Sequence, residues 1–268
     1  MTAGLLVLLA AAPASPPESA ARPDAEVLAA AEAAFSEGVR LRGDSAAARP
    51  AFARAAAGYD ELWRRGFHNP DLALNRANAK RLAGDLPGAV VALHEGLAAA
   101  RWSRPLQVAL EDARSAVGYP LTGDLAAQCR PAPPTGIGTR MSPAEAWAAA
   151  ALLWLMACAG VARFAMTRAG WWLAFAGLAA AALALLGGLW LRDDRRREAE
   201  NVEPLVVVAA DAYLRKGNSE FYPARLEAVL PKGVEARELT RRGGWVQVRL
   251  AGGAVGWLPE TAVLKVGD

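Results

Sequence analysis

The chain has 268 residues, a formal net charge of +3 at pH 7 and 54% hydrophobic residues, many of them alanine. This length allows two modest domains besides any membrane segment. There is no basic stripe with interleaved aromatic side chains, so nothing in the sequence indicates a nucleic-acid partner.

Residues 1–15 are short and apolar, with a run of leucine and valine from Leu5 to Leu9 followed by small residues. This pattern is typical of a signal peptide, although no lysine or arginine precedes the apolar run. The alternative is a disordered or weakly helical start. Residues 16–23, rich in proline, serine and alanine, are expected to form a linker.

Residues 24–119 have a helical composition interrupted by glycine and proline at intervals of about a dozen residues. Ala55, Tyr59 and Leu62 recur 34 residues later as Ala89, Leu93 and Gly96. A 34-residue period is typical of tetratricopeptide (TPR) repeats, each of which is a pair of antiparallel helices. The alternative is an ordinary helical bundle with coincidental spacing.

The TPR hypothesis makes local predictions. Small residues are needed where the paired helices cross, and Ala77, Ala89 and Gly96 occupy those positions. Gly84 and Asp85 are expected to form a turn, and an enlarged turn over residues 43–50 is expected to absorb an insertion in the first repeat. A last helix near residues 105–117 is expected to cap the stack.

Residues 120–143 are rich in proline and glycine and are expected to link this region to a membrane hairpin. Two apolar runs follow, which we predict to be transmembrane helices over residues 144–162 and 171–191. A hairpin of two spans places both ends of the chain on one side of the membrane. Cys158 lies inside the first run and Cys129 outside it, so no disulfide is expected between them.

The signals for orientation disagree. An exported N-terminus places both soluble domains in the periplasm and the loop with Arg163 and Arg168 in the cytoplasm, whereas the arginines at positions 192 and 195–197 favour a cytoplasmic C-terminus. We predict a bacterial inner-membrane protein with two spans and both domains periplasmic. Cys129 is then expected to react with a membrane-impermeant maleimide in spheroplasts.

Residues 203–266 contain short β-type segments separated by turns at positions 231–233 and 252–253, which predicts a small barrel. This stretch resembles bacterial SH3-like (SH3b) domains. The resemblance rests on four short segments, namely Ala212-Tyr-Leu214-Arg215, Leu230-Pro231-Lys-Gly233, Trp245-Val-Gln-Val248 and Gly256-Trp257-Leu258.

The order of signal peptide, TPR units, two spans and SH3b domain resembles the BatE-type proteins of Bacteroides aerotolerance operons. In the helical region the resemblance rests on residues 35–38, on Ala55 to Gly66, and on residues 75–79 with Gly84-Asp85, although Arg76 and Ala77 replace a family Leu and Gly. It implies a scaffold working beside von Willebrand A-domain membrane proteins and a MoxR-type ATPase, in an oxygen- or stress-tolerance complex.

No nucleophile, base and orienting group are spaced as catalysis requires, so we expect the chain not to be an enzyme. The two histidines, His68 and His94, lack the spacing of metal ligands and are expected to be plain turn or surface residues. No cofactor or metal is expected.

Two surfaces are candidates for binding. Leu74, Asn78 and Arg81 share one helix face that would line a TPR groove and bind a partner protein, or else form a solvated face without a ligand. In the C-terminal domain, Tyr213, Trp245 and Trp257 would offer an aromatic ligand cleft, unless they form the core.

These features together predict a multidomain α plus β protein, with N-terminal TPR-type helical repeats, a transmembrane helical hairpin and a C-terminal SH3-like β-barrel. The expected function is a membrane-anchored scaffold of the bacterial envelope that recruits partner proteins. The alternative is an anchor or sensor that binds peptidoglycan or a cell-wall peptide.

Overall fold

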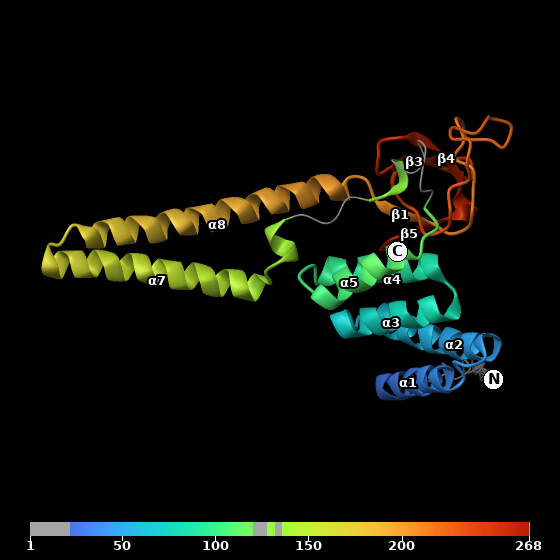
Figure 1. Cartoon of the computed structure of the whole chain (residues 1–268), viewed down its shortest axis with the longest axis horizontal. Coiled ribbons are helices and arrows are strands. Elements are labelled where there is room, and N and C mark those ends of the chain that lie inside the picture. The colour runs from blue at the N-terminus through green and yellow to red at the C-terminus, as the bar shows by residue number, and fades with distance from the viewer. Residues whose placement is uncertain (1–21, 120–127, 132–135, 268) are drawn as a thin grey trace, which may run out of the picture.

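The computed structural model describes residues 22–119, 128–131 and 136–267. It contains a stack of helices, a hairpin of two long helices and a five-stranded antiparallel sheet. The helical stack packs beneath the sheet, and the long hairpin projects away from both (Figure 1). The predicted signal peptide at 1–15 lies outside the described residues.

The helical stack has five helices joined by short turns, and consecutive helices pack against one another. They are α1 (Asp24–Arg40), α2 (Ser45–Arg64), α3 (Pro70–Ala83), α4 (Leu86–Ala99) and α5 (Arg104–Ser115). Side chains of Asn69 and Asp85 accept hydrogen bonds from backbone amides at the starts of α3 and α4. Gly84 ends α3 in the left-handed conformation, with a φ of 93°, which confirms the predicted turn.

The enlarged turn predicted over residues 43–50 is wrong. Helix α2 already begins at Ser45, because the Asp44 side chain accepts hydrogen bonds from the amides of Ala46 and Ala47. Pro50 lies inside this helix, where the alanine-rich first turns and the cap compensate for its missing amide hydrogen bond. The extra residues therefore lengthen α2 to 20 residues rather than forming a loop.

Small residues do lie where α3, α4 and α5 pack together. Ala77 and Ala89 are buried, and a Cβ atom added to Gly96 would lie 2.5 Å from Cβ of Ala73 and 3.1 Å from Cδ1 of Leu106. A glycine at position 96 therefore lets the backbones of α3 and α4 approach closely. The local predictions for this crossing are confirmed, while the assignment of the stack to the TPR class stays a prediction.

The hairpin consists of α7 (Pro143–Thr167) and α8 (Trp171–Asn201), which contain the two predicted spans. Both helices are long and apolar enough to cross a membrane, and only 6% and 11% of their apolar windows are buried within the protein. Helix α7 begins with a reciprocal capping box between Ser142 and Glu145. Gly160 lets α8 approach, because a Cβ there would lie 2.9 Å from Cβ of Ala176.

The sheet has the strand order β4-β3-β2-β1-β5. Its strands are β1 (Leu205–Val208), β2 (Glu235–Arg242), β3 (Trp245–Leu250), β4 (Val255–Pro259) and β5 (Val263–Lys265), and two 3₁₀ turns are η1 (Ile137–Thr139) and η2 (Glu260–Ala262). The sheet is not closed, in contrast to the predicted barrel. The segment between β1 and β2 pairs only through isolated bridges such as Ala212 with Leu230, so it adds no strand that would close the sheet.

Strand β1 is buried on both faces. Val206 and Val208 belong to the core of the sheet, whereas Val207 packs into the core formed by α3, α4 and α5. Successive side chains of a strand point to opposite faces, so one strand can serve two cores. The helical stack and the sheet are therefore joined through a shared strand.

We predict that Gly96→Val destabilises the protein by about 2 kcal/mol, because the added methyl groups collide with Ala73 and Leu106 in a packed crossing. Urea unfolding of the full chain in detergent, followed by tryptophan fluorescence, measures this loss. The control is Gly43→Val, at a turn position where an added Cβ meets nothing within 4 Å. Equal stability of the two variants would contradict the close crossing.

Candidate functional site

A buried carboxylate joins the helical stack to the sheet. Glu235, at the start of β2, lies directly opposite Val207 of β1 and is 4% exposed. Arg114 of α5 donates from Nε to Oε1 at 2.7 Å and from Nη2 to Oε2 at 2.8 Å. His94 Nε2 of α4 lies 2.9 Å from Oε2 and donates to it when it carries the proton. We call Glu235, Arg114 and His94 the joint.

The joint keeps Glu235 ionised. Burial raises the pKa of this carboxyl group, but the hydrogen bonds and charges of Arg114 and His94 outweigh burial and lower the pKa to about 2. The joint therefore holds a carboxylate that bonds two separate helices at once. The prediction that His94 is a plain surface residue is wrong, because His94 lies against Glu235 of the sheet. Glu235 is 141 residues away in sequence, so the sequence around His94 gives no sign of this contact.

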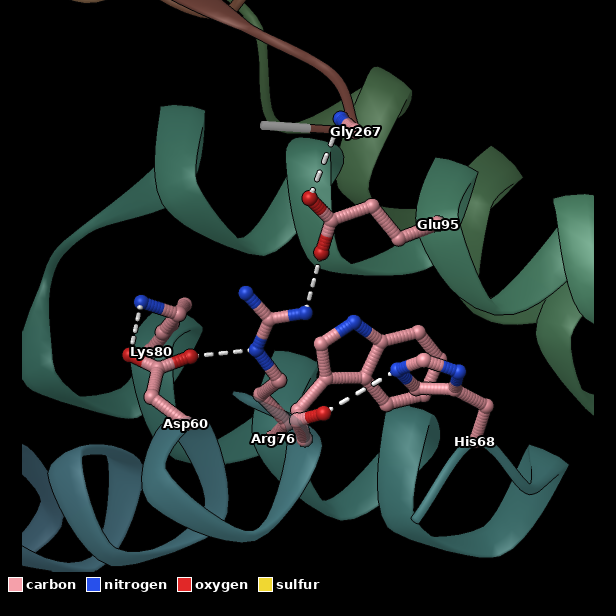
Figure 2. Close-up of polar contacts among 7 residues, drawn as sticks. Asp60, His68, Arg76, Lys80, Glu95 and Gly267 are labelled. Atoms are coloured by element: carbon pink, nitrogen blue, oxygen red, sulfur yellow. Dashed lines mark hydrogen bonds and ion pairs between the residues drawn. The ribbon is translucent and has the colours of Figure 1, made fainter. Parts of the chain in front are cut away.

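A second ion cluster lies inside the helical stack, and Figure 2 shows it. Arg76 of α3 is 9% exposed and pairs with Asp60 of α2 and with Glu95 of α4, while Lys80 Nζ lies 2.7 Å from Asp60 Oδ2. The guanidinium group also lies over the Trp63 ring, 5.3 Å from its centroid. This cluster ties three successive helices together.

The second cluster also reaches the C-terminal part of the chain. Glu95 Oε1 accepts a hydrogen bond of 3.2 Å from the backbone amide of Gly267, which follows β5 (Figure 2). His68 stacks near Trp63, with ring centroids 4.5 Å apart, and its Nε2 lies 3.0 Å from the Trp63 carbonyl oxygen. Besides the apolar contact of Val207, polar contacts of Glu235 and Glu95 thus attach the C-terminal part of the chain to the helical stack.

The three residues predicted to line the helical groove lie together on α3. Leu74 is half-buried and packs beside the core of α3, α4 and α5, Asn78 is half-buried, and Arg81 is exposed. Neither Asn78 nor Arg81 forms a side-chain hydrogen bond or ion pair with the residues that the structure describes. Their polar groups are available to a ligand.

The three predicted aromatic residues lie on the outer side of the sheet. Trp245 and Trp257 are half-buried and occupy diagonal positions on β3 and β4, while Tyr213 is 47% exposed. Tyr213 lies two residues before Arg215, whose backbone pairs with that of Trp257. The segment between β1 and β2, which carries Tyr213, also exposes the side chains of Phe221 and Tyr222. We call these five residues the aromatic surface.

The end of the long hairpin is also attached to the rest of the protein. Asp193 of α8 pairs with Arg197 at 2.6 Å and accepts a hydrogen bond from the amide of Gly138, just after the start of η1. Gln107 of α5 donates to the carbonyl of Thr139 at 2.7 Å. The glycine pair at 136 and 138 thus makes room for a carboxylate of α8, a role that the sequence did not suggest.

The expectation that Cys129 is accessible is wrong. Its side chain is fully buried in the core of the sheet, and burial raises the pKa of its thiol to about 11. Cys129 and Cys158 are both free, as expected. A maleimide test of orientation therefore needs a cysteine at another position.

No family model matches this chain, and no curated protein or solved structure matches it either. Within residues 22–119, 128–131 and 136–267, no group of three or more histidine, cysteine or acidic side chains could hold a metal ion.

We predict that Glu235→Gln lowers the free energy of unfolding by about 3 kcal/mol at pH 7, because the buried Arg114 then keeps only the exposed Glu111, 3.9 Å away, as a charged partner. Urea unfolding in detergent measures this loss. The control is Glu260→Gln, which removes a more exposed pair with Arg241 and should cost less than about 1 kcal/mol. Similar losses in both variants would contradict a special role for the joint.

The loss caused by Glu235→Gln should depend on pH. The folded pKa of about 2 lies below the ordinary value of 4.5, so the stabilisation by the carboxylate is fully present above about pH 4.5 and is lost as the pH falls towards 2. The difference in unfolding free energy between wild type and variant should shrink over this range. A difference that stays constant from pH 7 to pH 3 would show that the charge of Glu235 is not responsible.

Proposed function

We propose that this chain is a membrane-anchored scaffold of the bacterial envelope that holds two protein-binding surfaces in one fixed arrangement. The observation that carries this proposal is the joint, which packs the helical stack and the sheet together although the long hairpin separates them in sequence. The role is binding rather than catalysis.

Exposure of the hairpin supports anchoring in a membrane. Helices α7 and α8 pack against each other, yet most of their large apolar side chains face outward, with Trp147 and Met166 each 76% exposed. The long core helix of a soluble protein is mostly buried, and in water this much exposed apolar area would promote aggregation. A lipid bilayer is the environment that fits these two helices.

The joint also bears on topology. Arg114 precedes the hairpin and Glu235 follows it, so the two can meet only if both soluble parts lie on the same side of the membrane. Two spans satisfy this requirement. We propose that this side is the periplasm and that the membrane is the inner membrane, on the basis of the signal-peptide pattern at the N-terminus.

We predict that a cysteine introduced by Glu220→Cys, in a chain with Cys129→Ala and Cys158→Ala, reacts with an impermeant maleimide in intact spheroplasts. Glu220 is exposed in the segment that joins β1 to β2. A cysteine placed by Arg168→Cys in the turn between α7 and α8 is the matched control and should react only after lysis. The opposite labelling pattern would reverse the orientation.

The same proposal assigns the helical stack to the TPR class and the C-terminal domain to the SH3-like class. The helix pairs with short turns and the 34-residue spacing support a TPR-type stack, and the antiparallel sheet with its sequence segments supports an SH3-like domain. By resemblance to BatE-type proteins, the partners would be von Willebrand A-domain membrane proteins and a MoxR-type ATPase in an oxygen- or stress-tolerance system.

We predict that a double variant, Asn78→Ala with Arg81→Glu, reduces recovery of membrane partners at least about tenfold in pull-downs of the detergent-solubilised protein, since it removes two polar anchors. The control is Arg42→Glu, which makes the same charge change at an exposed position after α1. Unchanged recovery with the double variant would refute the groove on α3.

The aromatic surface favours a second candidate function, the binding of peptidoglycan or a cell-wall peptide. Its loop exposes Phe221 completely, and flat aromatic side chains bind sugars and peptides at low entropic cost. Such a protein would act as an anchor or sensor in the cell wall.

We predict, for this second function, that the wild-type protein sediments with purified murein sacculi and that a Tyr213→Ala, Phe221→Ala double variant does not. Both residues are exposed, so the variant should fold. Phe67→Ala, at an exposed aromatic residue of the helical stack, is the control and should sediment like wild type. Absence of wild-type sedimentation would exclude the second function.

A further inference from the structure

The turn between α4 and α5 lies beside the base of the long hairpin. The Gln107 side-chain amide of α5 donates to the carbonyl oxygen of Arg101 in this turn at 2.6 Å and to that of Thr139 in η1 at 2.7 Å. Three residues after Thr139, Ser142 caps the start of α7. Figure 1 shows the base of the hairpin beside α5. The turn is therefore held close to the point where the chain enters the hairpin.

The second helix of the hairpin sets the depth of this turn. Asp193 of α8 accepts a hydrogen bond from the amide of Gly138, the residue before Thr139. Asp193 follows Leu191, the last apolar residue of α8, by two residues, or about 3 Å along the helix axis. The headgroup layer of a bilayer is about 5–7 Å thick on each side. If α8 spans the membrane, as proposed above, the turn lies at about the depth of the lipid headgroups.

The turn exposes an aromatic and a basic side chain. Trp102 is 39% exposed, and Val108 on the outer side of α5 is 45% exposed. Arg104, at the start of α5, is exposed and forms no hydrogen bond or ion pair with the residues that the structure describes. Tryptophan is enriched at the interface between membrane and water, and arginine is attracted to anionic headgroups. Both side chains therefore suit the depth at which the turn lies.

The two ends of the helical stack differ in this respect. Short turns make consecutive helices antiparallel, so the turns at residues 41–44 and 84–85 lie at the end opposite to Trp102. Neither of these two turns contains an aromatic residue. The turn between α2 and α3 lies at the same end as Trp102 and exposes Phe67, but no hydrogen bond joins it to the described part of the hairpin.

The base of the hairpin carries further basic side chains. Arg192, Arg195 and Arg196 are exposed and share one face of α8, because they are spaced three and four residues apart. None of the three forms an ion pair within the part of the chain that the structure describes. Of the acids beside them, Asp193 is buried against η1, and Asp194 lies on the opposite side of the helix. This arrangement favours anionic headgroups around the hairpin.

We propose that the turn between α4 and α5 contacts the membrane surface, with Trp102 among the lipid headgroups and Arg104 paired with their phosphate groups. A bilayer is the occupant because this surface continues from the base of the hairpin and carries the charge that attracts anionic lipids. The contact depends on the membrane insertion of α7 and α8 proposed above. It adds that the helical stack itself lies against the bilayer.

The experiment places one spin label at a time on the full chain in nanodiscs of phosphatidylcholine and phosphatidylglycerol. In a chain with Cys129→Ala and Cys158→Ala, the label sites are Ser103→Cys in the turn, Ser115→Cys at the other end of α5, and Ala181→Cys in the apolar stretch of α8. Electron paramagnetic resonance measures collisions of each label with oxygen, which concentrates in lipid, and with a nickel complex, which stays in water.

We expect the nickel complex to collide with the Ser103 label at least about threefold less often than with the Ser115 label, because headgroups exclude it. The Ala181 label should collide mainly with oxygen. If the Ser103 label is as accessible to nickel as the Ser115 label while the Ala181 label lies in lipid, the contact is overturned and the membrane anchor stands. An Ala181 label in water would overturn the anchor and the contact together.

A variant tests the two side chains themselves. Trp102→Ala with Arg104→Gln should raise nickel collisions at position 103 about twofold or more, because the turn loses its headgroup contacts. The matched control is Phe67→Ala with Arg64→Gln, which removes an exposed aromatic residue and an exposed arginine near the other turn. Equal collision rates in the two variants would overturn the proposal. Shielding of the Ser103 label from both reagents would also overturn it, since a protein such as a second copy would then cover the turn.

Discussion

A carboxylate buried where two parts of a protein meet is stable only when hydrogen-bond donors, and preferably a positive charge, lie beside it. Glu235 comes from the sheet, and its partners Arg114 and His94 come from two helices of the stack. Separating the two parts would break the two hydrogen bonds between Arg114 and Glu235. It would also expose Val207, which is buried in the core of α3, α4 and α5, to water. The joint combines charge pairing, which fixes orientation, with apolar burial, which supplies most of the free energy.

This constraint shapes the rest of the molecule. The joint connects residues on either side of the hairpin and fixes the face of α3 that carries the proposed groove relative to the aromatic surface. If the hairpin spans a membrane, as proposed, the joint requires the helical stack and the sheet to lie on the same side of it. The Asp193 contacts then attach the hairpin to η1, and thereby to α5. The proposed scaffold function thus depends on this packing.

Local sequence signals predicted the local structure well. The breakers and caps predicted the turn at Gly84, and the 34-residue spacing placed Gly96 at a helix crossing. Short β-type segments were expected over residues 203–266, and the three consecutive valines at 206–208 are a signal for burial on both faces that the prediction did not use. The error at residues 43–50 arose because the inserted residues were assigned to a turn, whereas the Asp44 cap and the alanines that follow it sustain a helix through Pro50.

The ion clusters were not predictable in the same way. The sequence distinguishes Arg76 only as a replacement of a family leucine. In the structure it is the centre of a cluster whose acids lie on two other helices. Arg114 and Glu235 are 121 residues apart, and nothing in the local pattern of either indicates the other. A buried charge depends on partners from distant segments, so local periodicity cannot reveal it. The groove and aromatic residues were identified from their local faces, and the structure places both sets at least partly in reach of solvent.

A double-mutant cycle on Arg114 and Glu235 tests the joint most directly. The unfolding free energies of the wild type, Arg114→Met, Glu235→Gln and the double variant give the coupling between the two side chains. We expect a coupling of at least about 1 kcal/mol at pH 7, since each single change removes from a buried charge the partner with which it forms two hydrogen bonds. A coupling near zero would mean that the helical stack and the sheet are not held together through this pair.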